Sequence, residues 1–263
     1  MPTETVKLSN GVELPVLGLG VWQVTRRETP QVVRWALEAG YRHVDTATLY
    51  QNEEGVGEGV RESGVPREEL FVTTKFQPRS GDPERELATS LRKLRMDYVD
   101  LYLIHWPVGA PTRHWSAFER LYERGLARSV GVSNYGAAET REVVRAASVP
   151  PMVNQVELNP FAHRRRLVEA CRGLGVVVEA YSPLTRGRDL TNPTIVRVAE
   201  KHGRTPAQVV LRWAVQRDTV VLPKSRDRER IRSNARIFDF ALDADDLAAL
   251  DALDRTGGTD SAN

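Results

Sequence analysis

The sequence contains very little cysteine and no long apolar run. Cys171 is the only cysteine among 263 residues, so the chain cannot form an internal disulfide, and its setting LVEACRGLG predicts a buried structural thiol. No apolar stretch approaches the roughly 18 residues that a membrane-spanning helix needs. The N-terminus MPTETVKLSNG lacks the basic and then apolar pattern of a signal peptide. We therefore expect a cytoplasmic protein with no membrane partner.

An excess of charge of one sign is also lacking. The 37 lysines and arginines nearly balance the 35 acidic residues, for a net charge of +2, so no strong field attracts nucleic acid. The arginines at 164–166 are expected to form a solvated helix face. No linker or composition break divides the chain, and we predict one domain over 1–263. The mixed charges of the helices indicate no dimer face, so a monomer is the default expectation.

What the chain does contain is a regular alternation of strand and helix patterns. The dipeptide Asn10-Gly11, between two short β-prone runs, predicts an N-terminal β-hairpin. Eight strand patterns follow it: VLGLGVW, residues 41–47, LFVTTK, YVDLYLIH, ARSVGVSN, MVNQVEL, VVVEAYS and TVVLP. Helical patterns come after them, at 29–40, 52–64, 82–94, 115–125, 137–148, 164–175, 193–202, 206–217 and 243–253.

This alternation predicts an α/β protein with parallel strand pairing and right-handed crossovers. Eight such units in about 250 residues fit a closed (β/α)8 TIM barrel. The alternative is an open doubly wound sheet. Its dinucleotide fingerprint is missing, because GVGEGV at 55–60 ends in valine where a glycine is required and does not directly follow a strand.

Polar and aromatic side chains stand at the predicted strand ends, which is where a (β/α)8 barrel carries its active site. They are Trp22, Asp45 (followed by Tyr50), Lys75, His105, Ser133, Asn134, Gln155, Asn159, Tyr181, Ser182, Lys224 and Ser225. Each has a structural explanation when taken alone. Asp45 and Lys75 could be an ion pair, His105 a core histidine, and Tyr50 surface packing. Their gathering at one end of the barrel favours an active site.

Four of these residues form a consistent chemical set. A buried carboxylate needs a partner, and Asp45 can pair with Lys75. Lys75 is in turn expected to lower the pKa of Tyr50 from its reference value of about 10. Tyr50 would then be a general acid toward a carbonyl oxygen that His105 orients. The histidines and the cysteine show no His-x-x-x-His or Cys-x-x-Cys spacing, so no metal site is predicted.

The motifs GLGVW, YRHVDTATLYQNEEGVG, VTTK, YVDLYLIHWP, GVSN, NQVELNP, EAYSPL and LPKS occur in order over nearly the whole chain. Together they resemble the aldo-keto reductases, most of all the small bacterial branch that includes diketogluconic acid reductases. The resemblance implies a (β/α)8 barrel that binds NADPH in an extended form and transfers hydride to an aldehyde or ketone. It implies a catalytic tetrad of Asp45, Tyr50, Lys75 and His105, with Tyr50 as the acid.

The same resemblance implies contacts with the cofactor and the substrate. Cofactor contacts at the first strand would be Gly20, Val21 and Trp22. The nicotinamide carboxamide and ring would contact Ser133, Asn134, Gln155 and Tyr181, and the pyrophosphate would contact Ser182 and Leu184. The 2′-phosphate and adenine would contact Lys224, Ser225, Arg230 and Asn234. A lysine, a serine and an arginine suit a phosphate group. The implied substrate contacts are Trp22, Tyr50, His105 and Trp106.

The chain departs from the family pattern in three places. Ser233 stands where the family often has glutamate, which affects the adenine contact. The loop after HWP and the tail RTGGTDSAN are both short. These two segments shape the substrate pocket in the family, so we expect a pocket open on one side, with Trp22 and Trp106 as its apolar walls. Broad, weak selectivity for small carbonyl compounds follows.

Two other functions are compatible with the same strand ends. Lys75 could be the Schiff-base lysine of an aldolase, with Asp45 and Tyr50 moving protons. The barrel could also be a non-catalytic module that senses NADPH or binds a partner. The phosphate-binding pattern at Lys224-Ser225 argues against the aldolase, and the intact tetrad argues against the sensor.

Overall fold

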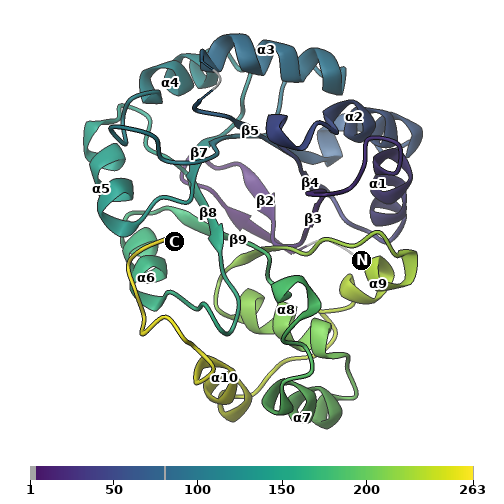
Figure 1. Ribbon diagram of the computed structural model, residues 1–263. Coiled ribbons are helices and arrows are strands. Elements are labelled where there is room, and N and C mark those ends of the chain that lie inside the picture. Colours follow the sequence, from purple (N-terminus) through teal and green to yellow (C-terminus); the bar gives the residue numbers. More distant parts are fainter. Residues whose placement is uncertain (1–3, 80, 263) are drawn as a thin grey trace.

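The computed structural model describes residues 4–79 and 81–262, and eight parallel strands form its centre (Figure 1). In chain order the strands are β3 (Gly18–Gly20), β4 (His43–Asp45), β5 (Phe71–Phe76), β6 (Leu101–Ile104), β7 (Val130–Ser133), β8 (Val153–Glu157), β9 (Val177–Tyr181) and β10 (Val220–Leu222). Each strand pairs in parallel with the next in the chain. A parallel bridge between Leu17 and Val221 joins the first strand to the last. The predicted (β/α)8 barrel is confirmed.

The helices that follow the strands form a ring outside the barrel (Figure 1). They are α1 (Thr29–Glu38), α2 (Glu53–Glu62), α3 (Pro83–Leu94), α4 (Trp115–Glu123), α5 (Ala137–Ala146), α6 (Arg165–Gly173), α7 (Pro193–His202), α8 (Pro206–Gln216), α9 (Arg228–Asn234) and α10 (Ala244–Asp251). The local signals act as expected. Asp82 accepts backbone hydrogen bonds at the start of α3. The segment GVGEGV lies inside helix α2, so it does not form a dinucleotide-binding loop.

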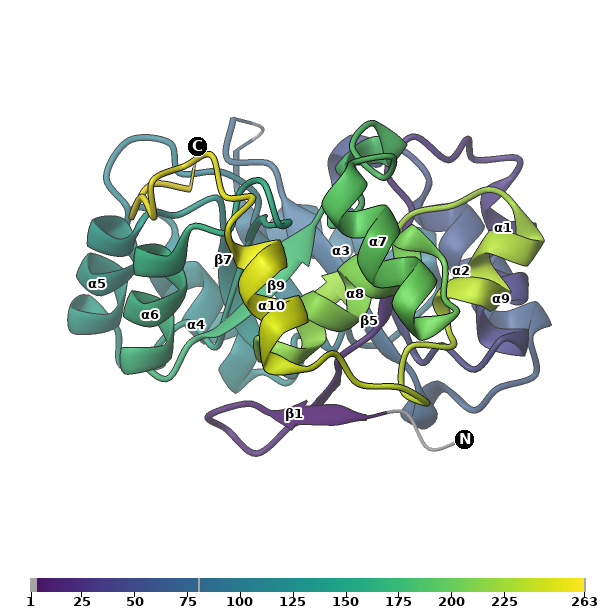
Figure 2. The ribbon, with the colours of Figure 1, turned by 90° about the horizontal axis from the view of Figure 1, so that it is seen from below.

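The N-terminal hairpin lies across one end of the barrel, opposite the end where the C-terminal segment runs (Figure 2). Its strands β1 (Thr5–Lys7) and β2 (Glu13–Pro15) pair antiparallel, and Gly11 in the turn has a φ of +87°. Leu14 packs fully into the core. The hairpin therefore covers the amino-terminal side and leaves the carboxyl ends of the strands open.

Two expectations about secondary structure differ from what is observed. Helix α9, which carries two of the predicted cofactor residues, has only seven residues and was not predicted. The strand expected at 41–47 is confined to β4, because Thr46 and the residues after it turn toward the 3-10 helix η1 (Thr48–Tyr50).

Arg164 is buried, not solvated. Its guanidinium donates to the backbone oxygens of Glu157 and Ser261, at 3.0 and 2.7 Å, and so ties the tail to β8. Arg165 and Arg166 are exposed, as expected.

The predicted burial of the cysteine is confirmed. Cys171 is a buried, free thiol. Within residues 4–79 and 81–262, no helix is both long and apolar enough to cross a membrane. The single domain over 1–263 stays a prediction, and residues 1–3, 80 and 263 lie outside the described part.

Candidate active site

A long cleft opens at the carboxyl ends of the strands, with a volume of about 1510 Å³. This exceeds the roughly 300–1,000 Å³ of pockets that hold one drug-sized ligand. Most of the predicted site residues line it, namely Gly20, Trp22, Asp45, Tyr50, His105, Trp106, Ser133, Asn134, Gln155, Tyr181, Ser182, Leu184, Lys224, Ser225, Arg230 and Asn234. Three do not. Lys75 lies beneath the cleft floor, and the side chain of Val21 is in the hydrophobic core. Asn159 is buried outside the cleft lining, where its Oδ1 accepts a hydrogen bond from the backbone N–H of Phe161.

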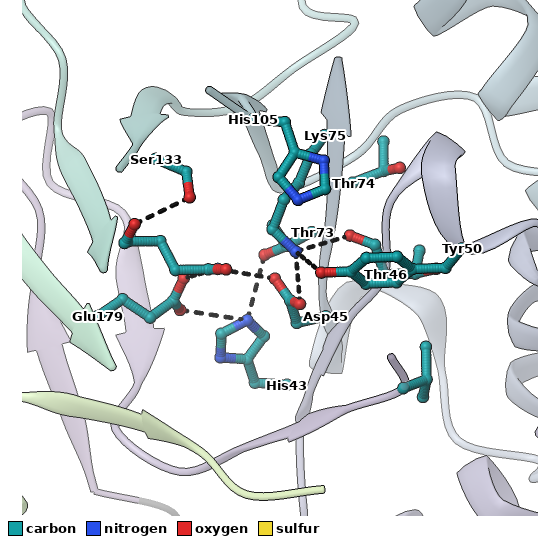
Figure 3. Close-up of polar contacts among 12 residues, drawn as sticks. His43, Asp45, Thr46, Tyr50, Thr73, Thr74, Lys75, His105, Ser133 and Glu179 are labelled. Atoms are coloured by element: carbon teal, nitrogen blue, oxygen red, sulfur yellow. Dashed lines mark hydrogen bonds and ion pairs between the residues drawn. The ribbon is translucent and has the colours of Figure 1, made fainter. Parts of the chain in front are cut away.

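The ammonium of Lys75 lies at the centre of the tetrad (Figure 3). It donates to Asp45 Oδ1 at 2.6 Å, to the backbone oxygen of Thr46 at 3.0 Å, and to the Tyr50 hydroxyl at 3.3 Å. All three ammonium donors are thus used, although the side chain is fully buried. Burial is the largest single effect and lowers the pKa of Lys75, but Asp45, Tyr50 and Glu179 together outweigh it and the net shift is upward. Lys75 is therefore a fixed cation.

The pKa of Tyr50 corrects one expectation. Burial raises this pKa, Lys75 opposes the shift, and Asp45 adds to it, so that the net direction is upward. Lys75 limits the rise and does not reverse it, because burial is the largest effect and Asp45 offsets part of the Lys75 charge at the phenol. Tyr50 therefore keeps its proton at neutral pH. It can give that proton to an oxyanion, and Lys75 is placed to stabilise the phenolate that results.

His105 is the second polar group above the floor, with its ring 5.7 Å from that of Tyr50 in an edge-to-face arrangement. Burial, followed by the charge of Lys75, lowers its pKa to about 3. The imidazole is neutral at physiological pH, so it has one N–H to donate. A neutral donor beside a phenol suits an uncharged carbonyl oxygen.

Amide and hydroxyl groups line the next part of the cleft. Ser133 donates to the backbone oxygen of Gln155 at 2.8 Å, and the Asn134 amide donates to Ser133 Oγ and to the His105 backbone oxygen, both at 3.0 Å. The Tyr181 hydroxyl donates to Asn134 Oδ1 at 2.8 Å. These bonds hold the Tyr181 ring beside the amides, an arrangement that fits a flat ring bearing a carboxamide.

Basic side chains gather at the far end of the cleft. Lys224, Ser225 and Arg230 line it there, as predicted. Sequence reasoning missed Arg226, which also lines this end and forms an ion pair with Glu28 at 3.5 Å. Its place directly after the predicted Lys-Ser pair was the available signal. Together these groups make a site for an anion such as a phosphate.

Two further features of the cleft opening were not predicted from the sequence. The guanidinium of Arg186 lies 4.6 Å from the centre of the Trp22 ring, so a loop after β9 touches a loop after β3. Leu49 is 51% exposed and Trp106 is 36% exposed, and both line the cleft. An exposed leucine beside Tyr50 is a third apolar wall. A single leucine in a polar loop gave no sequence signal.

The cleft fits an extended dinucleotide phosphate. It has a ring-sized aromatic and amide site at one end and three basic side chains at the other. Gly20 also lines the cleft, and a Cβ at this position would approach the Leu222 backbone oxygen to 3.3 Å, so β3 and β10 are packed closely here. The donors thus match a nicotinamide and a 2′-phosphate.

Comparisons with known proteins agree with this geometry. Residues 16–255 match the model of the Aldo/keto reductase family. A glyoxal reductase of Bacillus subtilis is 46% identical, over 97% of this chain and 95% of that protein. A morphine 6-dehydrogenase of Pseudomonas putida is 44% identical, over 95% and 90%.

Solved structures give the same result. A Bombyx mori aldo-keto reductase in complex with NADP superposes with a TM-score of 0.91 at 34% identity, over the full length of both chains. A Brucella melitensis aldo/keto reductase gives a TM-score of 0.92 at 42% identity, over 96% of this chain and all of that one. This chain therefore belongs to the aldo/keto reductase family, and it is an NADPH-dependent oxidoreductase that reduces aldehydes or ketones.

Proposed function

We propose that Tyr50 is the general acid of this reductase and that its substrates are small aldehydes and α-dicarbonyl compounds. The contact between Lys75 Nζ and the Tyr50 hydroxyl carries the proposal. This contact places the protonated phenol of Tyr50, which faces the cleft, beside the buried and fixed ammonium of Lys75. When bound, NADPH supplies the hydride. The chain's own residues orient the carbonyl group and supply the proton.

The carbonyl oxygen would lie between the Tyr50 hydroxyl and the His105 imidazole, with both groups donating to it. As negative charge develops on this oxygen, Tyr50 transfers its proton, and Lys75 stabilises the phenolate. Asp45 holds the ammonium in place at 2.6 Å. Ser133, Asn134 and Gln155 would hold the carboxamide, so that one ring face points at the carbonyl carbon.

The aldolase alternative loses its support at Lys75. A Schiff base needs a neutral, accessible amine, whereas this ammonium is buried, makes three hydrogen bonds and has a raised pKa. The sensor alternative leaves the Tyr50–Lys75 contact without a role.

The opening of the cleft supports the small-substrate proposal. Its apolar walls are Trp22, Leu49 and Trp106, and two of them are exposed, Leu49 at 51% and Trp106 at 36%. A pocket whose apolar walls are open to solvent places little restriction on the shape of the substrate. A glyoxal reductase among the relatives is consistent with small dicarbonyls. Low kcat/KM values spread over many small aldehydes are expected, and inert small aldehydes beside one tightly bound bulky ketone would contradict the proposal.

Tyr50→Phe tests the acid directly. Loss of a positioned acid should lower kcat for glyoxal by at least about 100-fold, while NADPH binding, followed by quenching of tryptophan fluorescence, should stay within about twofold of wild type. Tyr122→Phe removes a phenol from α4, away from the cleft, and is the matched control. Near-normal turnover by Tyr50→Phe would exclude Tyr50 as the acid.

A monomer and a cytoplasmic location remain predictions. Size-exclusion chromatography with light scattering would test the first.

A further inference from the structure

The barrel interior holds a second carboxyl group that the proposed mechanism does not use. Glu179 lies on β9 and is fully buried. Figure 3 shows it near Asp45, with a dashed line joining its carboxyl group to the His43 ring. Burial of a carboxyl group is costly unless the group is paired or neutral. Among the described residues, Glu179 forms no ion pair with a lysine or an arginine, and its basic neighbour is His43, whose Nε2 lies 3.6 Å from Glu179 Oε1.

One side chain bridges the two carboxyl groups. The amide nitrogen of Gln155 donates to Asp45 Oδ2 at 2.8 Å and to Glu179 Oε2 at 2.5 Å. Glu179 Oε1 has no hydrogen-bond partner in the described structure. Asp45 has the Lys75 ammonium at 2.6 Å as well. Of the two acids, Asp45 therefore carries the negative charge, and Glu179 is the one that must hold a proton.

The other titratable groups around Glu179 are His43 and Asp45 on β4, Tyr50 in η1 and Lys75 on β5. The neighbouring strand β10 presents Val220 in register. Burial lowers the pKa of His43 to about 3, so this ring is neutral. Its ring occupies the place where a Cβ at Gly18 would stand, 2.6 Å from His43 Nδ1. The interior thus contains one cation, one anion and one neutral acid.

We propose that Glu179 is a positioning residue whose protonated form keeps Tyr50 an effective acid, and that its ionisation switches turnover down. The inference rests on the proposed role of Tyr50. A charge on Glu179 would add a second anion near Lys75 and Tyr50, which raises the pKa of both. Tyr50 would then give up its proton less readily. An ionised Glu179 would also attract the Gln155 amide nitrogen more strongly, and this nitrogen donates to Asp45 as well.

Glu179 is expected to ionise at a lower pH than Tyr50. Burial, followed by the charge of Asp45, raises the pKa of Glu179 to about 8, whereas the pKa of Tyr50 is raised from about 10. Wild type should therefore lose hydride-transfer rate in two steps as pH rises, first with Glu179 and then with Tyr50.

The first experiment measures the single-turnover rate of NADPH oxidation by 4-nitrobenzaldehyde between about pH 6 and pH 10 for wild type, Glu179→Gln and Glu58→Gln. Glutamine at 179 keeps the shape and neutrality of the protonated acid. We expect it to hold the neutral-pH rate up to about pH 9, where wild type has fallen by roughly threefold to tenfold. Glu58→Gln, on the exposed face of α2, should follow wild type. A lower step that persists in Glu179→Gln would overturn the inference.

The second experiment needs neither turnover nor a folded variant. The infrared spectrum of wild type should contain the C=O band of a buried carboxylic acid at pH 7, and this band should disappear above about pH 8. Absence of the band at pH 7 would show that Glu179 is already ionised and would end the proposal. The Tyr50→Phe result is independent of this band, so failure of the proposed acid and failure of the Glu179 role are distinguishable.

Discussion

At the scale of single residues, the strength of the Tyr50 acid is set by a balance of opposing effects. Burial favours the neutral phenol, the Lys75 ammonium favours the phenolate, and Asp45 screens Lys75. Sequence reasoning identified the residues and their pairing. It gave the wrong net direction for the pKa, because the magnitude of burial depends on how the surrounding strands close, and no spacing in the sequence encodes that.

The choice of cofactor also belongs to single residues. Lys224→Ala should raise KM for NADPH by about 10-fold or more, since it removes one charge-assisted contact to a phosphate. KM for NADH, which lacks the 2′-phosphate, should change by less than about twofold. Steady-state assays with both cofactors check this. Equal increases for the two cofactors would mean that Lys224 does not contact the 2′-phosphate.

At the scale of elements, the strand ends were the most predictable part of the molecule. Parallel strands bring their carboxyl ends to one side, so Asp45, Lys75 and His105 could be gathered from their spacing alone. Helix α9 could not, because its seven residues are too few to show a helical period. Glu179 had a weak signal, an acid in the otherwise apolar run VVVEAYS. This run gives no indication that Gln155 on β8 lies beside Glu179.

The loop after β9 is an element whose conformation has a testable purpose. Ser182, Thr185 and Arg186 all have positive φ in it, a conformation that non-glycine residues adopt at some cost. The stacking of Arg186 on Trp22 holds this loop across the cleft, over the expected path of the cofactor.

Arg186→Ala should therefore weaken NADPH binding by roughly twofold to fivefold, the size of an exposed cation–π contact. Stopped-flow measurement of NADPH release should show the change mainly in the dissociation rate. Arg188→Ala removes a neighbouring exposed arginine that does not line the cleft and is the control. Identical release rates in Arg186→Ala and wild type would mean that the stacking does not retain the cofactor.

At the scale of the whole molecule, the buried groups make stability depend on pH from two sides. His43 and His105 have pKa values of about 3 in the folded protein, below the reference of 6.5. The unfolded chain binds protons at these residues first as pH falls, so their contribution to stability is lost from about pH 6.5 downward. Glu179 acts in the opposite direction. Its folded pKa of about 8 lies above the reference of 4.5, so stability falls as pH rises from about 4.5 to 8.

Glu179→Gln separates the two contributions, because glutamine does not titrate while both histidines remain. The free energy of unfolding of the variant minus that of wild type should grow with pH at roughly 1 kcal/mol per pH unit between about pH 5 and pH 8, and then level off. Urea unfolding followed by circular dichroism at a series of pH values gives this difference, with Glu58→Gln as the surface control. A difference that stays constant across this range would mean that Glu179 is ionised in the folded barrel throughout, with its charge compensated by the surrounding strands.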